Sequence, residues 1–364
     1  MADRDSRIDI IRLIALGCLV ELHYLYRCDL YNFPIDGLKG FVFCILRAIG
    51  TCCIPLFLLI SGYLLAGRQY KKGYYLKLSK IIVIYLISSV ISNIYKSLFV
   101  TVYEPDSFID FIFNFLSFHG CPYAWYIELY IGVFLLSPFI NLVYHHLEES
   151  GKKTLLYIML LSTAAPSLLN IYRVLDAPWW LQPNTNSVYD QFIPQYWIGL
   201  WPFTYYLLGV RLKEKGSVFS KRITVVFLPV AIVIYGLFNY WRSVGGVYLW
   251  GTWQDWGAWT NVATSYLFFS LVLYMKPIHS DFLKRVIGRL SDSVFAAYLL
   301  SWIPEVAIYG AILNNPMRYD HRMRYYPAII AVYVLSLLIG MVVMYIYKYL
   351  VKGVARFGLL KGRN

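Results

Sequence analysis

The chain has 364 residues, of which 59% are hydrophobic and only 15% charged, and its mean hydropathy is +0.56. A soluble domain is nearer half apolar and a quarter charged, so this composition excludes a water-soluble fold for most of the chain. The net charge of +13 does not indicate a nucleic-acid partner, because excess Lys and Arg orient the loops of a membrane protein toward the cytosol. We therefore expect the lipid bilayer, and no nucleic acid, as a partner.

Ten apolar runs follow one another along the chain, and each is close to the ~20 residues that an α-helix needs to cross the hydrocarbon core. The predicted spans are 8–28, 41–66, 79–101, 123–144, 154–172, 196–212, 222–241, 258–276, 291–313 and 326–350. The sequence shows no internal repeat. The expected fold is therefore all-α, a polytopic transmembrane helix bundle of about ten spans that forms one domain over residues 1–364.

Basic residues concentrate in every second connection between the predicted spans. These connections are 67–78, 145–153, 211–222 and 276–290, whereas segment 102–122 has three acidic residues and no Lys or Arg. The positive-inside rule then places both termini and the basic connections in the cytosol. We expect a multi-pass protein of the cell membrane whose other connections face outward.

The first predicted span contains charged residues, which cost several kcal/mol inside a membrane and often mark functional sites. Arg12 and His23 are 11 residues apart, close to three helical turns, so both project from nearly one face, about 16 Å apart along the axis. An imidazole exchanges protons near neutral pH, which makes His23 a candidate general base. The spacing alone fits equally well an Arg12 that snorkels to lipid phosphates and a His23 that forms structural hydrogen bonds.

Several motifs occur along the chain in a fixed order. They are Arg12-x10-His23 with Asp9 before it, IPLFLLISGYLL with Ser61 and Gly62, the Lys77-x-x-Lys80 step, AWYIELYIGVFLLSP with Trp125 and Pro138, and the later TYYLLGVRL and SDSVFAAYLL. Over most of the chain this order resembles the acyltransferase-3 family of polytopic membrane acyltransferases. Only a short tail follows the tenth predicted span in this sequence, so we expect the chain to resemble the stand-alone O-acetyltransferase branch most. One departure is Ser301, which stands where many relatives have a histidine.

The resemblance implies transfer of an acyl group from cytosolic acyl-CoA to a hydroxyl of a cell-envelope or exported glycan. Acetyl-CoA is the expected co-substrate and a succinyl donor the alternative, with no tightly bound cofactor and no metal. The cations of Arg12, Lys77 and Lys80 suit the phosphates of the donor. His23 is the expected catalytic base and Glu128 a candidate to orient it, while a transient acetyl-histidine is the alternative to direct transfer.

The glycan or lipid-linked sugar acceptor is expected to approach from the outer side. Trp125, which heads one of the family-like segments, is a candidate to contact the sugar. Arg318, Arg322 and Arg324 lie in an outer connection against the charge rule, so they are either solvated beside lipid headgroups or bind an anionic acceptor. The alternative function is a transporter or flippase for a lipid-linked saccharide, which would also need buried charges.

Overall fold

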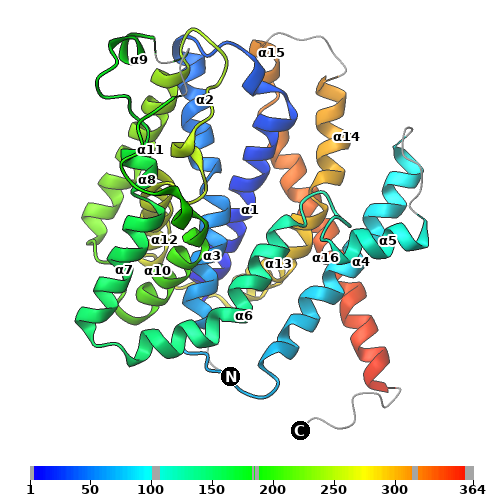
Figure 1. Cartoon of the computed structure of the whole chain (residues 1–364). Helices are drawn as coiled ribbons and strands as arrows, with labels where there is room; N and C mark the ends of the chain where they lie inside the picture. Colours follow the sequence, from blue (N-terminus) through cyan, green and yellow to red (C-terminus); the bar gives the residue numbers. More distant parts are fainter. Residues whose placement is uncertain (1–3, 101–106, 183, 185–187, 314–318, 357–364) are drawn as a thin grey trace. The chain divides into compact units, whose positions relative to one another are not determined.

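The computed structural model describes residues 4–100, 107–182, 184, 188–313 and 319–356. Within these ranges the chain is helical and contains no strand, apart from one isolated parallel bridge between Ile35 and Val244. The predicted all-α fold is therefore confirmed. The chain divides into two compact units, and each is described by itself. Figure 1 labels their helices.

Unit 1 comprises Met1–Tyr70, Leu136–Ile278 and Pro316–Tyr326. Its α-helices are α1 (Ser6–Arg27), α2 (Gly37–Gly50), α3 (Cys53–Leu65), α7 (Glu149–Thr163), α8 (Pro166–Leu169), α9 (Ala177–Leu181), α10 (Trp201–Lys215), α11 (Lys221–Ser243), α12 (Trp259–Leu273) and α15 (Tyr319–Arg324). Short 3₁₀ helices are η1 (Leu30–Asn32), η3 (Gln195–Leu200) and η4 (Thr252–Gln254). Helix α6 (Trp125–His146) contributes its second half to this unit.

Unit 2 comprises Lys71–Leu135, His279–Asn315 and Pro327–Asn364. Its helices are η2 (Tyr74–Lys77), α4 (Leu78–Phe99), α5 (Phe108–Leu116), the first half of α6, α13 (Asp281–Leu300), α14 (Trp302–Leu313) and α16 (Ala328–Arg356). Its core joins α4, α13 and α16 through Ile84, Ala296, Leu300, Val343 and Met344.

Five helical segments of the described chain are long and apolar enough to cross a membrane, and the bent pair α13–α14 makes a sixth if it forms one span. The five are Gly37–Leu65, Tyr74–Phe99, Trp125–His146, Lys221–Ser243 and Ala328–Gly353. Three predicted spans, 154–172, 196–212 and 258–276, overlap α7, α10 and α12, which have 15 residues each and are shorter than the ~20 residues of a full crossing. The multi-pass architecture is thus supported, and the count of about ten stays a prediction.

Helices α3 and α10 of unit 1 pack against each other over an extended contact (Figure 1). A Cβ atom on Gly62 would lie 1.9 Å from the carbonyl oxygen of Tyr206, and one on Gly209 would lie 2.2 Å from that of Leu59. Only glycine permits two backbones to approach so closely, as at small-residue crossings in membranes. The SGYL and LGV motifs therefore encode this packing.

Replacing Gly62 with alanine tests the crossing. Gly62→Ala is expected to destabilise the protein by about 1–3 kcal/mol or more, because the added methyl forces two packed backbones apart. The matched control is Gly132→Ala on α6, where a Cβ meets no atom within 4 Å, and we expect it to be neutral or slightly stabilising. Thermal unfolding in detergent measures both; equal melting temperatures would contradict the packing role of Gly62.

Two of the basic connections, 145–153 and 211–222, meet at one end of unit 1. Near the N-terminus, Arg7 Nη1 donates to the carbonyl of Leu273 at 2.8 Å, and the backbone amide of Ile278 donates to Ser6 Oγ at 3.0 Å. Glu149 at the start of α7 pairs with Arg211 near the end of α10. The orientation predicted from charge, with both termini in the cytosol, stays a prediction.

The opposite end of unit 1 is closed by the connection between α11 and α12. The carboxamide oxygen of buried Asn239 accepts hydrogen bonds from Tyr248 Oη, Trp253 Nε1 and Gln254 Nε2 at 2.9, 3.2 and 2.8 Å. The amide of Ile35, in the connection after α1, donates to the carbonyl of Gly246 at 2.8 Å. Two predicted outer connections are therefore joined to each other.

Cysteine labelling tests which end faces the cytosol. Ser217→Cys, between α10 and α11, is expected to resist a membrane-impermeant thiol reagent in intact cells, whereas Val247→Cys at the opposite end is expected to react. The six native cysteines are free and buried, so they should give little background. Labelling of Ser217→Cys with protection of Val247→Cys would reverse the predicted orientation.

Candidate active site

The N-terminal part of α1 positions the first candidate residue, Arg12. Asp5 caps the helix, because its Oδ1 accepts a hydrogen bond from the backbone amide of Arg7 at 3.0 Å. One turn later Asp9, only 3% exposed, accepts from Arg4 at 2.6 and 2.8 Å and from Arg12 Nη1 at 3.1 Å. The guanidinium of Arg12 is thus held by a buried carboxylate three residues before it, while 28% of its side chain remains exposed.

His23 lies near the opposite end of the same helix and is partly buried. Since α1 is unbroken from Ser6 to Arg27, the predicted separation of about 16 Å between Arg12 and His23 holds along the axis. The neighbouring acid Glu21 is buried and accepts a hydrogen bond from Tyr326 Oη at 2.7 Å. Residues two apart on a helix do not face each other, so Glu21 is poorly placed to orient His23.

The other candidates for catalysis and donor binding belong to unit 2. Glu128 and Trp125 lie in the first turn of α6 and are exposed, and Trp125 packs edge-on against Tyr126. Lys77 ends η2 with its Nζ 5.7 Å from the centre of the Tyr74 ring. Lys80 lies in the first turn of α4, and both lysines are exposed. The roles of these four residues stay predictions.

The three arginines of the predicted basic outer connection differ in their surroundings. Arg318 lies outside the described residues. Arg322 is bound to the end of α1, because its Nη1 donates to the carbonyl of Cys28 at 2.8 Å and pairs with Asp29 at 3.4 Å. Arg324 is exposed. Arg322 therefore has a structural partner, and Arg324 is the more accessible of the two described arginines.

Arg47 is a buried cation that sequence reasoning missed. It is 3% exposed on α2, and its guanidinium lies 4.9, 5.0 and 6.0 Å from the ring centres of Tyr248, Trp250 and Tyr31. Its Nη1 also donates to Tyr235 Oη at 3.3 Å. Rings at such distances stabilise a cation through their negative faces. Arg47 lies within predicted span 41–66. A charged residue inside a membrane span is a candidate functional residue, so its position in the sequence could have identified it.

Trp250, Trp253, Trp256 and Trp259 recur every third residue between α11 and the start of α12, but they do not share one exposed face. Trp253 is fully buried and hydrogen-bonded to Asn239, whereas Trp250 is half exposed beside Tyr31. The backbone amide of Trp259 donates to Ser167 Oγ at 2.9 Å. Their spacing of three residues therefore does not produce a common face, and Trp250 offers the largest exposed ring among the four.

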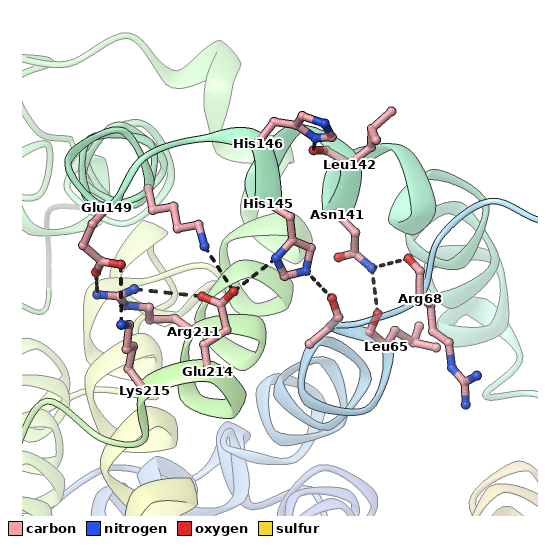
Figure 2. A network of polar contacts seen from close by, with 12 residues as sticks. Leu65, Arg68, Asn141, Leu142, His145, His146, Glu149, Arg211, Glu214 and Lys215 are labelled. Carbon is pink, nitrogen blue, oxygen red and sulfur yellow. Dashed lines mark hydrogen bonds and ion pairs between the residues drawn. The ribbon is translucent and has the colours of Figure 1, made fainter.

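A second polar cluster, also missed from the sequence, lies at the end of unit 1 that holds the N-terminus (Figure 2). Glu214 accepts from Lys152 at 3.2 Å and lies 3.2 Å from Nδ1 of His145, whose Nε2 donates to the carbonyl of Ala66 at 2.6 Å. Asn141 Nδ2 donates to the carbonyls of Leu65 and Arg68 at 2.7 and 2.8 Å. The cluster fastens α3, α6, α7 and α10 together.

Arg211 extends this cluster toward Glu149, as Figure 2 shows. Its Nη2 donates to Glu149 Oε1, and its Nη1 lies 4.0 Å from Glu214 Oε2. The hydrogen bond from Arg211 holds the pKa of Glu149 below its ordinary value. The acidic residues of the cluster are thus neutralised by neighbouring bases. The only sequence signal was the presence of charges in connections 145–153 and 211–222.

Comparison with known proteins adds one match. The model of the acyltransferase-3 family, described as an acyltransferase domain, matches residues 5–347 and so includes segments of both units. No curated protein and no solved structure matches the chain.

Replacing the two described arginines of the outer connection separates their roles. Arg322→Gln is expected to lower the free energy of unfolding by about 1.5–3 kcal/mol, because it removes charged hydrogen bonds at the end of α1. Arg324→Gln is the matched control and should change it by less than ~0.5 kcal/mol, as exposed surface substitutions usually do. Thermal unfolding in detergent measures the difference. An Arg322→Gln protein as stable as the control would contradict the structural role.

Proposed function

Because this chain belongs to the acyltransferase-3 family and is a membrane acyltransferase, we propose that it moves an acetyl group from cytosolic acetyl-CoA to a hydroxyl of a cell-envelope or exported glycan. The observation that supports this most directly is the Arg12–His23 pair on one face of an unbroken α1. The family match also favours acyl transfer over transport of a lipid-linked saccharide. Succinyl is the alternative acyl group.

The donor binds at the cytosolic end of α1 in this proposal. Arg12 is held by Asp9 and still partly exposed, so its guanidinium can face the phosphates or the thioester of the donor. Lys77 and Lys80, three residues apart at the start of α4, supply further charge for the phosphates. The flexible pantetheine arm then carries the thioester along α1 toward His23.

His23 acts as the general base for the transfer. Its imidazole takes the proton of the acceptor hydroxyl while the oxygen attacks the thioester carbonyl carbon. The tetrahedral intermediate collapses with cleavage of the carbon–sulfur bond, and the coenzyme A thiolate recovers the proton from the imidazolium. Glu128 is the candidate to orient the ring. Direct transfer needs one chemical step fewer than a route through acetyl-histidine.

The acceptor approaches from the outer side in this proposal. Trp125 offers an exposed indole for the apolar face of a sugar ring, and Arg324 offers an exposed cation for a phosphate or carboxylate on the glycan. Arg322 holds the segment that carries Arg324 to the end of α1 through its contacts with Cys28 and Asp29. Arg318 belongs to the same basic connection in the sequence.

Two substitutions on α1 test the division of roles. His23→Ala is expected to lower the transfer rate by ~10²–10⁴ while acetyl-CoA still binds. Arg12→Ala should instead weaken donor binding; Asp9 keeps its hydrogen bonds to Arg4, so the helix should still fold. His146→Ala is the matched control, since His146 is exposed on α6 and bonds only to the carbonyl of Leu142 among described partners.

The measurements are acetyl-CoA binding and coenzyme A release by purified protein in nanodiscs, with and without glycan acceptor. Full turnover by His23→Ala would remove His23 from the reaction. Radiolabelled acetyl-CoA without acceptor, followed by rapid quench, separates the two routes. Label retained on wild-type protein and absent from His23→Ala would favour the acetyl-histidine route over direct transfer.

A further inference from the structure

A large apolar groove lies within unit 1, away from the Arg12–His23 pair in sequence. Its volume is about 960 Å³, at the upper end of the ~300–1,000 Å³ of common ligand pockets. Helices α7, α11 and α12 each contribute one face, and Leu208 of α10 also lines it. On α11 the lining residues are Phe227, Val230, Ala231 and Ile234, which follow the i, i+3, i+4, i+7 pattern of a single helical face.

The groove has two distinct ends. Lys153, Arg211 and the Val218–Phe219 segment line the end near the polar cluster of Figure 2. Leu168 and Trp259 line the other end, where the amide of Trp259 donates to Ser167 Oγ. Between them the lining is almost entirely aliphatic and aromatic. One end of the groove is therefore basic and the rest is apolar.

The length of the groove matches a lipid chain. Along α7 the lining runs from Lys153 to Ala164 at the C-cap, which is about 16 Å at 1.5 Å per residue. Half of a bilayer's hydrocarbon core is about 15 Å thick. Several lining side chains are exposed, among them Tyr157, Leu161 and Phe227. An acyl chain of one leaflet therefore fits along the groove and would cover apolar surface.

At the basic end, the hydrogen-bonding capacity of the cations is only partly satisfied by the residues that the structure describes. Glu149 and Glu214 are paired with Arg211, Lys152 and Lys215. Arg211 is only 9% exposed, and its Nη1 makes no hydrogen bond with any residue that the structure describes. Lys153 is exposed and forms no ion pair among those residues. These two cations are placed to receive an anionic oxygen.

We propose that this groove binds an anionic glycerophospholipid, with one acyl chain along α7 and α11 and the phosphate at Lys153 and Arg211. Basic pockets between membrane helices bind acidic headgroups in this manner. Because Arg211 also bonds to Glu149, the bound phosphate adds a further partner to the cluster that joins α3, α6, α7 and α10. The lipid thus stabilises unit 1 at the end that holds the N-terminus.

Native mass spectrometry of the detergent-purified protein tests the proposal with two probes, dioleoyl phosphatidylglycerol and dioleoyl phosphatidylcholine. Wild-type protein is expected to bind the anionic lipid at least ~10-fold more tightly. Lys153→Gln should weaken that binding by ~5-fold, since one cation near a lipid surface contributes about that factor. The matched control is Lys352→Gln on α16, which removes an exposed lysine from the end of another membrane helix and should change nothing.

A second pair of variants tests the chain-binding part. Ala231→Phe fills the groove and should abolish retention of the lipid, whereas Val226→Phe, an exposed position on α11 outside the lining, should leave it intact. If Ala231→Phe fails to fold, Ala263→Phe on the α12 side replaces it. Equal affinity for both lipids, or unchanged binding in the groove-filling variant, overturns the proposal. These readouts measure binding only, so they are independent of whether acetyl transfer occurs.

Discussion

Hydrocarbon offers no hydrogen bonds, so every charged group inside this bundle must find its partners within the protein. Unit 1 meets this constraint in two ways. Asp9 is surrounded by the guanidinium groups of Arg4 and Arg12, so its charge is neutralised. Arg47 and Arg242 lie instead among aromatic rings, with Arg242 4.2 Å from the centre of Trp179. The abundance of Tyr and Trp in this chain thus has a structural use, since ring faces accommodate cations without introducing further charge.

The same constraint shapes the proposed chemistry. Asp9 accepts a hydrogen bond from Arg12 and so fixes the position of its guanidinium. In the proposed mechanism the donor therefore binds to an arginine that does not change its position. A fixed cation loses little conformational freedom when it binds an anion, which favours affinity. Glu21, two residues before His23, accepts a hydrogen bond from Tyr326. This buried acid therefore already has a structural partner. Of the polar groups on α1, Arg12 and His23 are the two that we assign to chemistry.

The sequence predicted the all-α membrane fold, the family and the shared face of Arg12 and His23, because these follow from composition, motif order and helical periodicity. It did not predict the surroundings of Arg47, since Tyr31, Tyr235 and Tyr248 come from distant segments whose contacts leave no local pattern. Helix length was a further limit. A hydropathic run does not reveal that predicted span 154–172 breaks near Ala164 into α7 and α8.

Trp250, Trp253, Trp256 and Trp259 recur every third residue, yet the burial of Trp253 shows that this spacing gives no common exposed face. Periodic tryptophans predict an exposed stripe only if the segment is one regular helix, and here it is a turn, the short η4 and the start of α12.

The resulting connection is held firmly at several points. Asn239 binds three of its side chains, Arg47 contacts Tyr248 and Trp250, and Ile35 pairs with the backbone of Gly246. A segment fixed in this way has little loop entropy left to lose when a ligand binds. If the acceptor contacts this surface, it therefore meets a preorganised one, and selectivity among glycans depends on the shape of that surface and on its exposed groups.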